Sequence, residues 1–134
     1  NTLLETQLKR AKVAARLLKN MPTCTKNQAL EKIADALIAH SEEILEANKK
    51  DMAHAKEVNM TKAMQDRLLF THERIVGVSD GVKKVATLPD PIGEVIESWT
   101  RPNVLEISKV RVPIGVFGII YEARPNVTVD IASL

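Results

Sequence analysis

The sequence predicts an α/β fold made of a helical N-terminal layer, a β-ribbon, and the first strand and helix start of a further α/β part. Three observations support this. Apolar residues recur at helical spacing through residues 1–89, their period changes to two in residues 90–112, and residues 114–121 are apolar at nearly every position. A run of the last kind is typical of a strand covered by helices on both faces. We therefore divide the chain at residues 89 and 112, and residues 113–134 form the start of the last part.

Five helices are expected in the first part. The first covers residues 2–20, where leucine and alanine form one apolar stripe. Thr25 precedes the second helix at the spacing of a capping box, and Ser41 is expected to cap the third. Thr61 and Thr71 are expected to open two further helices, the last of which ends before a proline.

Residues 92–99 and 104–112 alternate apolar and polar side chains and are separated by a turn that contains Pro102. This pattern predicts two paired strands. The apolar phase slips near Ser108 and Lys109, which indicates a bulge or bend. Because an isolated hairpin is only marginally stable in water, the ribbon is expected to pack on something else.

A polar corner, Glu122-Ala-Arg-Pro-Asn126, follows the apolar run. Ligands of open α/β sheets bind at this edge, where strands end and helices begin. Pro125 suits the first turn of a helix, and Asn126 would lie near its free N–H groups. Arg124 could hold a carboxylate or phosphate through two parallel hydrogen bonds. Alternatively, Glu122 and Arg124 pair with each other or cap a neighbouring helix.

Composition excludes several classes. With 45% hydrophobic, 27% charged and only 3% aromatic residues and a net charge of +2, the chain lacks the stacking residues and the basic surplus of a nucleic-acid binder. No segment is long and apolar enough for a membrane span, and a single cysteine suits a reducing compartment. We therefore expect a cytoplasmic protein without nucleic-acid or membrane partners. His40, His54 and His72 lack the spacing of metal ligands, so no metal is assigned.

The passage from Val112 to Asp130 resembles the gamma-glutamyl phosphate reductases, also called glutamate-5-semialdehyde dehydrogenases, of the aldehyde dehydrogenase superfamily. The resemblance continues upstream, in the order that the family shows, and covers nearly the whole chain. The upstream stretches are residues 30–37, 46–51, 64–68, 74–77 and 90–96.

The resemblance implies NADPH-dependent reduction of L-glutamate 5-phosphate to L-glutamate 5-semialdehyde with release of phosphate, a step of proline biosynthesis. It implies that residues 113–134 begin the dinucleotide-binding core. It also implies that the backbone of residues Ile120, Tyr121, Glu122 and Ala123 forms one wall of the NADPH cleft, and that Arg124 binds the substrate. It also implies that Asn126 is catalytic and stabilises the oxyanion formed when a cysteine attacks the acyl carbon. An alignment without gaps, however, puts Arg124 at the superfamily's asparagine position. The oxyanion donor therefore stays open between Asn126 and the backbone, and NADPH is not distinguished from NADH.

The resemblance further implies that this chain is an N-terminal portion, inactive alone, with the nucleophilic cysteine beyond Leu134. Cys24, which lies between two helices without activating neighbours, is better interpreted as a packing or loop residue. Homo-oligomerisation through the ribbon and association with a glutamate 5-kinase are the partners implied. Two alternatives remain: another NAD(P)-dependent aldehyde dehydrogenase of the superfamily, or a non-catalytic oligomerisation module.

Overall fold

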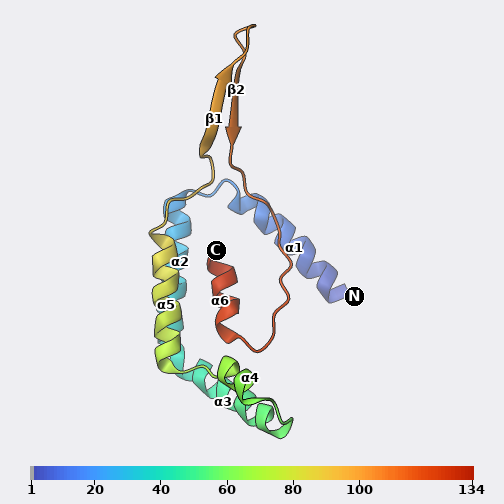
Figure 1. Cartoon of the computed structure of the whole chain (residues 1–134), viewed down its shortest axis with the longest axis vertical. Helices are drawn as coiled ribbons and strands as arrows, with labels where there is room; N and C mark the ends of the chain where they lie inside the picture. The colour runs from blue at the N-terminus through green and yellow to red at the C-terminus, as the bar shows by residue number, and fades with distance from the viewer. Residues whose placement is uncertain (1) are drawn as a thin grey trace. The chain divides into compact units, whose positions relative to one another are not determined.

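The computed structural model describes residues 2–134, Thr2 by its backbone alone, and the chain forms two compact units. The first unit contains the residues up to 23 together with residues 89–118; the second contains residues 24–88 and 119–134. Figure 1 shows the order of the elements. The first unit holds helix α1 (Thr2–Leu18) and strands β1 (Val95–Thr100) and β2 (Glu106–Val110). The remaining elements belong to the second unit apart from the first residue of α2; they are α2 (Thr23–Ala39), α3 (Ser41–Glu57), α4 (Lys62–Leu68), α5 (His72–Ala86) and α6 (Pro125–Ser133).

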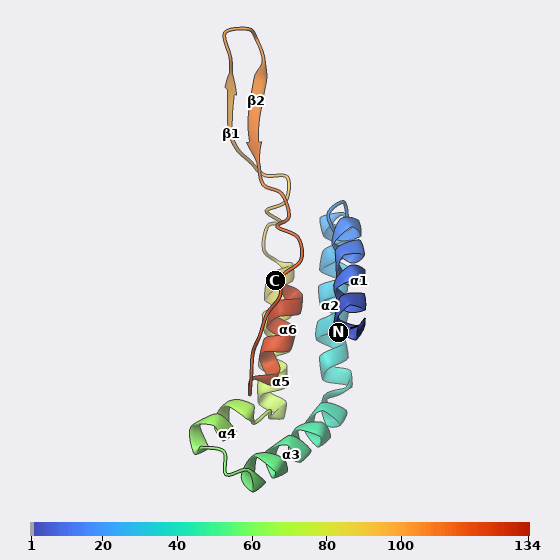
Figure 2. The ribbon, with the colours of Figure 1, turned by 90° about the vertical axis from the view of Figure 1, so that its right-hand side faces the viewer.

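The core of the second unit lies where its helices meet. Ala34, Ala55, Phe70, Ile75 and Val82 are all buried. The hydroxyl of Ser79 on α5 is also buried and donates a hydrogen bond to the carbonyl oxygen of Ala34 on α2, 3.0 Å away. In both Figure 1 and Figure 2, α6 runs alongside α5, and the two helices are in contact. In the described part of the chain, no helix combines the length and the apolar character that crossing a membrane requires.

The helix caps were predicted with mixed success. Thr25 was expected to precede the second helix, but α2 begins at Thr23 and Thr25 lies inside it. The hydroxyls of Thr61 and Thr71 accept hydrogen bonds from the backbone N–H of Met64 and Arg74, so both caps are confirmed. The cap at Ser41 was wrong: the N-cap residue is His40, and Ser41 lies buried in the first turn of α3. Only one residue separates α2 from α3, and it takes the cap position, so Ser41 falls inside the helix.

The two strands of the ribbon pair antiparallel, from Val95 opposite Val110 to Thr100 opposite Glu106. The predicted bulge occurs opposite Lys109, but the extra residue, Ile96, lies in β1 rather than in β2. A phase slip read from one strand shows that the register changes but does not show which strand carries the insertion. All residues of β1 are exposed, and the described chain therefore covers neither face of this strand.

The buried strand predicted for residues 114–121 is wrong for this chain. The segment has no strand pairing, and its large side chains are exposed, with 85% of Ile114, 64% of Phe117 and 102% of Ile120 accessible. A strand needs neighbouring strands to satisfy its backbone groups and helices to cover it. The described residues supply no such partner strand, since the only sheet among them is the ribbon. The helix expected to start at Pro125 is confirmed as α6.

Candidate active-site cleft

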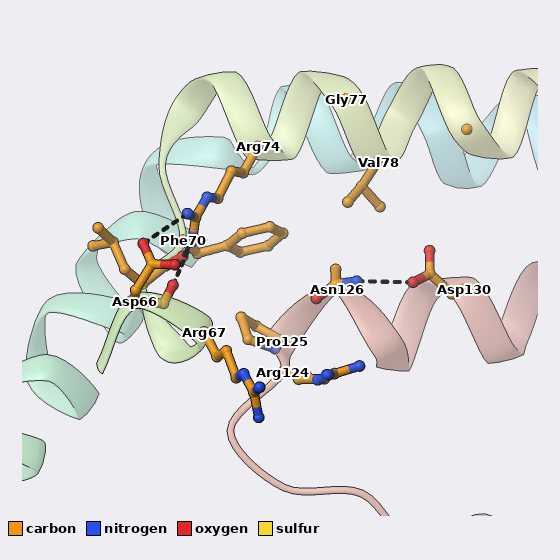
Figure 3. Close-up of a pocket in the computed structure, with 12 residues that line it drawn as sticks. Asp66, Arg67, Phe70, Arg74, Gly77, Val78, Arg124, Pro125, Asn126 and Asp130 are labelled. Carbon is orange, nitrogen blue, oxygen red and sulfur yellow. Dashed lines mark hydrogen bonds and ion pairs between the residues drawn. The ribbon is translucent and has the colours of Figure 1, made fainter. Parts of the chain in front are cut away.

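A cleft of about 490 Å³ opens in the second unit between the end of α4, the first turns of α5 and the start of α6 (Figure 3). Phe70, Val78 and Pro125 contribute its apolar lining. The polar lining is rich in charge and consists of Asp66, Arg67, Arg74, Arg124, Asn126 and Asp130. Both residues that the sequence predicts as site residues in this region, Arg124 and Asn126, therefore lie in the same cleft.

A buried asparagine fixes one wall of the cleft. Asn48 on α3 is 5% exposed; its Nδ2 atom donates to the carbonyl oxygen of Leu68 at 2.9 Å, and its Oδ1 atom accepts from the backbone N–H of Phe70 at 2.8 Å. These two bonds satisfy backbone groups in the turn between α4 and α5, which would otherwise be left without partners. Asn48 thus holds the turn that carries Phe70.

Arg74 ties the start of α5 to the end of α4. Its Nη1 atom donates to the carbonyl oxygens of Asp66 and, at 2.7 Å, Leu69, while its Nη2 atom lies 3.0 Å from Oδ1 of Asp66. Figure 3 shows these bonds as dashed lines. Because its guanidinium and the Asp66 carboxylate neutralise each other, Arg74 serves the local structure and adds little uncompensated charge.

The third wall is the beginning of α6. Arg124 occupies the N-cap position without a side-chain capping bond, and Pro125 follows as the first helical residue. The half-buried Asn126 donates from Nδ2 to Oδ2 of Asp130 at 2.9 Å (Figure 3). One N–H of the amide is therefore directed at a carboxylate, and the other remains for a ligand. Among the described residues, no group accepts from the backbone N–H of Asn126.

Two arginines of the cleft, Arg67 and Arg124, have no hydrogen-bond or ion-pair partner for their guanidinium groups within the described residues. In particular, the alternative in which Glu122 pairs with Arg124 is not what the structure shows. Both arginine side chains are exposed at the cleft. The site thus presents two uncompensated positive charges beside an amide donor, a combination suited to an anion.

The residues expected to form the cofactor wall lie in the loop before α6 and do not line the cleft. Ile120 is fully exposed, and Ala123 has a positive φ of 51°. The hydroxyls of Tyr121 and Thr128 are 2.6 Å apart, which ties this loop to α6. The structure does not test the cofactor role expected for these four residues, nor the roles expected for Arg124 and Asn126. All of these roles stay predictions.

Sequence reasoning missed Arg67, Arg74 and Asn48, which reach the cleft or its walls from helices that were assigned only to the helical N-terminal layer. It could have found Asp130, since residues four apart on a helix are neighbours and Asn126 precedes Asp130 by four. Cys24 is exposed and does not line the cleft. Among the described residues, no three His, Cys, Asp or Glu side chains are grouped so as to hold a metal ion.

The described helices and the two-stranded ribbon are consistent with a portion of an α/β protein, the class that the sequence predicts. No family model matches the chain. It is, however, 57% identical over 121 residues to the gamma-glutamyl phosphate reductase of Geobacillus sp., covering 90% of this chain and 29% of that protein. To the gamma-glutamyl phosphate reductase of Moorella thermoacetica it is 53% identical over 136 residues, which cover 100% of this chain and 32% of the relative.

The crystal structure of gamma-glutamyl phosphate reductase from Thermotoga maritima matches with a TM-score of 0.95 at 45% identity, covering 100% of this chain and 32% of that one. The Saccharomyces cerevisiae enzyme of the same name gives a TM-score of 0.88 at 36% identity, covering 93% and 32%. The resemblance to the gamma-glutamyl phosphate reductases is thus confirmed in sequence and in fold. The chain spans about 30% of the length of the curated relatives that it matches.

Proposed function

We propose that this chain is part of a longer enzyme that reduces L-glutamate 5-phosphate to L-glutamate 5-semialdehyde with NADPH and releases phosphate, in proline biosynthesis. The names and identities of the relatives support this activity. The observation that carries the proposal in this chain is the unpaired guanidinium of Arg124 beside the half-buried amide of Asn126 in one cleft. The substrate offers a carboxylate and a phosphate, both of which a guanidinium binds well.

Asn126 is assigned to the stabilisation of charge on the reacting carbonyl oxygen. In the proposed reaction a cysteine sulfur attacks the acyl carbon, the carbonyl oxygen becomes negative, and the carbonyl reforms as phosphate leaves with its electron pair. Donors that are already oriented toward that oxygen lower the barrier because they need no reorganisation. The free N–H of the Asn126 side chain and its unbonded backbone N–H are the two donors available here, and either could act.

The nucleophile is assigned to a residue outside this chain, because Cys24 does not line the cleft. For the cofactor we propose the loop of residues 120–123. Among the described residues no group accepts from the backbone N–H of Tyr121, Glu122 or Ala123, so this loop has main-chain donors left for a ligand. A nicotinamide cofactor bound there supplies the hydride for the reduction.

The remaining assignments concern assembly. We propose that residues 90–112 serve homo-oligomerisation, because every residue of β1, including Trp99, is exposed. Residues 1–89 and 113–134 are assigned to the cofactor domain. A cytoplasmic location and association with a glutamate 5-kinase belong to the same proposal. The alternative supported by the exposed ribbon is a non-catalytic oligomerisation module.

The test is the reverse reaction of the longer enzyme, in which L-glutamate 5-semialdehyde, phosphate and NADP⁺ give L-glutamate 5-phosphate and NADPH. The formation of NADPH is measured by its absorbance. We expect the Arg124→Ala variant to raise the KM of phosphate or of L-glutamate 5-semialdehyde, according to which anionic group Arg124 binds. The expected rise is roughly tenfold or more, which is the loss of affinity expected when a charged hydrogen bond is removed. Unchanged kcat and KM would remove Arg124 from the site. Replacing NADP⁺ by NAD⁺ tests the cofactor preference, and the 134-residue chain alone is expected to show no turnover.

A further inference from the structure

Arg67 is the second unpaired cation of the cleft, and the proposed function leaves it without a role. It lies in the last turn of α4 and is exposed, and its guanidinium contacts no acidic group among the described residues. Its neighbour Asp66, the nearest acidic residue in sequence, is already held by Arg74. In Figure 3, Arg67 and Arg124 both extend near Pro125, and no dashed line joins either one to another residue.

The other charged lining groups do not cancel these two. Asp66 is compensated by Arg74 at 3.0 Å, and Asp130 accepts the hydrogen bond of the Asn126 amide at 2.9 Å. Of three arginines and two aspartates in the lining, Arg67 and Arg124 are the arginines whose guanidinium groups remain without a bonded partner. Both guanidinium groups therefore remain available to an anion in the cleft.

We propose that Arg67 and Arg124 together form a two-arginine clamp for a phosphoryl group. This inference rests on the proposed function, which assigns only Arg124 to an anionic substrate. A phosphoryl group carries up to two negative charges on three tetrahedrally arranged oxygens, so it can engage two guanidinium groups from different sides. A carboxylate has one charge and two oxygens in one plane, and a single bidentate arginine satisfies it. Two separate arginines therefore favour phosphate.

The clamp joins two segments that are far apart in sequence, the end of α4 and the start of α6. Asn48 and Arg74 fix the first segment through their bonds to backbone groups of residues 66–70. The hydroxyl contact between Tyr121 and Thr128 ties the loop before α6 to that helix. The two guanidinium groups are thus presented from supported backbone, as a binding site requires.

The first experiment titrates inorganic phosphate into the 134-residue chain and follows the Nε–Hε signals of Arg67 and Arg124 by NMR. We expect both signals to shift with one dissociation constant, and acetate at the same ionic strength to shift them far less. Arg67→Gln and Arg124→Gln should each weaken phosphate binding about fivefold or more. Lys62→Gln, which removes a charge from the same helix outside the cleft, should leave it nearly unchanged. Arg67→Lys keeps the charge but loses the two-pronged geometry, and we expect it to recover only part of the affinity.

The outcomes separate the two proposals. If Arg67→Gln binds phosphate as well as the original chain while Arg124→Gln does not, the clamp is wrong and the role of Arg124 stands. If Lys62→Gln weakens binding as much as Arg67→Gln, the effect is one of overall charge and the clamp is also wrong. Circular dichroism of each variant checks that the helices remain.

A second experiment identifies the source of the phosphoryl group, which could be the acyl phosphate or the nucleotide cofactor. In the reverse assay of the longer enzyme, Arg67→Gln should raise the KM of phosphate by about fivefold or more if the clamp holds the substrate's phosphate. A comparable rise in the KM of NADP⁺ alone would assign the clamp to the cofactor. No change in either KM would overturn the clamp.

Discussion

The side-chain amide of Asn126 and the carboxylate of Asp130 are joined by a 2.9 Å hydrogen bond across one turn of α6. The amide nitrogen is the donor, so the carboxylate fixes the plane of the amide. It also determines which of the two N–H groups points away from the carboxylate. An oxyanion donor must be oriented before the charge develops. Asp130 is therefore a positioning residue for Asn126 if the amide, rather than the backbone, is the donor.

Replacing Asp130 tests that relationship. In the longer enzyme, Asp130→Ala should lower kcat by about tenfold, equivalent to about 1.4 kcal/mol in the barrier, with little change in the KM of phosphate. Asp130→Asn retains an oxygen acceptor and should recover most of the rate. The measurement is steady-state kinetics of these two variants and of Asn126→Ala. For Asn126→Ala, kcat is expected to fall by about a hundredfold. Equal losses in Asp130→Ala and Asp130→Asn would argue against an orienting hydrogen bond.

Asn48 should be one of the most sensitive positions of the second unit. Asn48→Ala leaves the N–H of Phe70 and the carbonyl oxygen of Leu68 without their partners in a buried turn. We expect a loss of about 2–3 kcal/mol in the free energy of unfolding, measured by urea denaturation. Asn48→Asp, nearly identical in shape, cannot donate to Leu68 and should also destabilise. Asn20→Ala, at an exposed position, is the control and should change stability by less than about 0.5 kcal/mol.

Some local features of the fold could be predicted from the sequence, while features that depend on distant partners could not. Thr61 and Thr71 act within four residues of themselves, and their caps were predicted correctly. The two hydrogen bonds of the Asn48 side chain join residues that are twenty or more positions apart, so no local sequence pattern predicts them. The same holds for the site. Arg124 and Asn126 adjoin a recognisable corner, whereas Arg67 belongs to the site only because the fold makes α4 line the same cleft as the start of α6.

The tip of the ribbon contains a strained residue. Val104 has a φ of 66°, in the left-handed region that disfavours β-branched residues, and its N–H closes a turn on the carbonyl oxygen of Arg101 at 2.8 Å. Its side chain is 80% exposed, so truncating it sacrifices little packing. Val104→Gly should relieve roughly 1–2 kcal/mol of strain against roughly 0.5–1 kcal/mol of added unfolded-state entropy. Amide hydrogen exchange in β1 and β2 should slow by about two- to fivefold. Leu105→Gly, the neighbouring control, should speed it, and slower exchange in both variants would contradict a strain effect.

The exposed segment of residues 114–121 gives the sharpest test of whether further polypeptide completes this fold. Ile120 is fully exposed here, whereas Ile75 is fully buried in the core of the second unit. In the 134-residue chain, Ile120→Ala should change the free energy of unfolding by less than about 0.5 kcal/mol, and Ile75→Ala should lower it by about 2–5 kcal/mol.

In the longer enzyme the two substitutions should become alike, because a strand with apolar side chains on both faces is stable only when it is covered on both. Denaturation of the four variants and of the two unsubstituted proteins measures this directly. If Ile120→Ala remained neutral in the longer enzyme, residues 114–121 would not form a buried strand there. The cleft at the start of α6 would then not lie at the carboxyl edge of a sheet, and its position would no longer favour Arg124 and Asn126 as the place of the reaction.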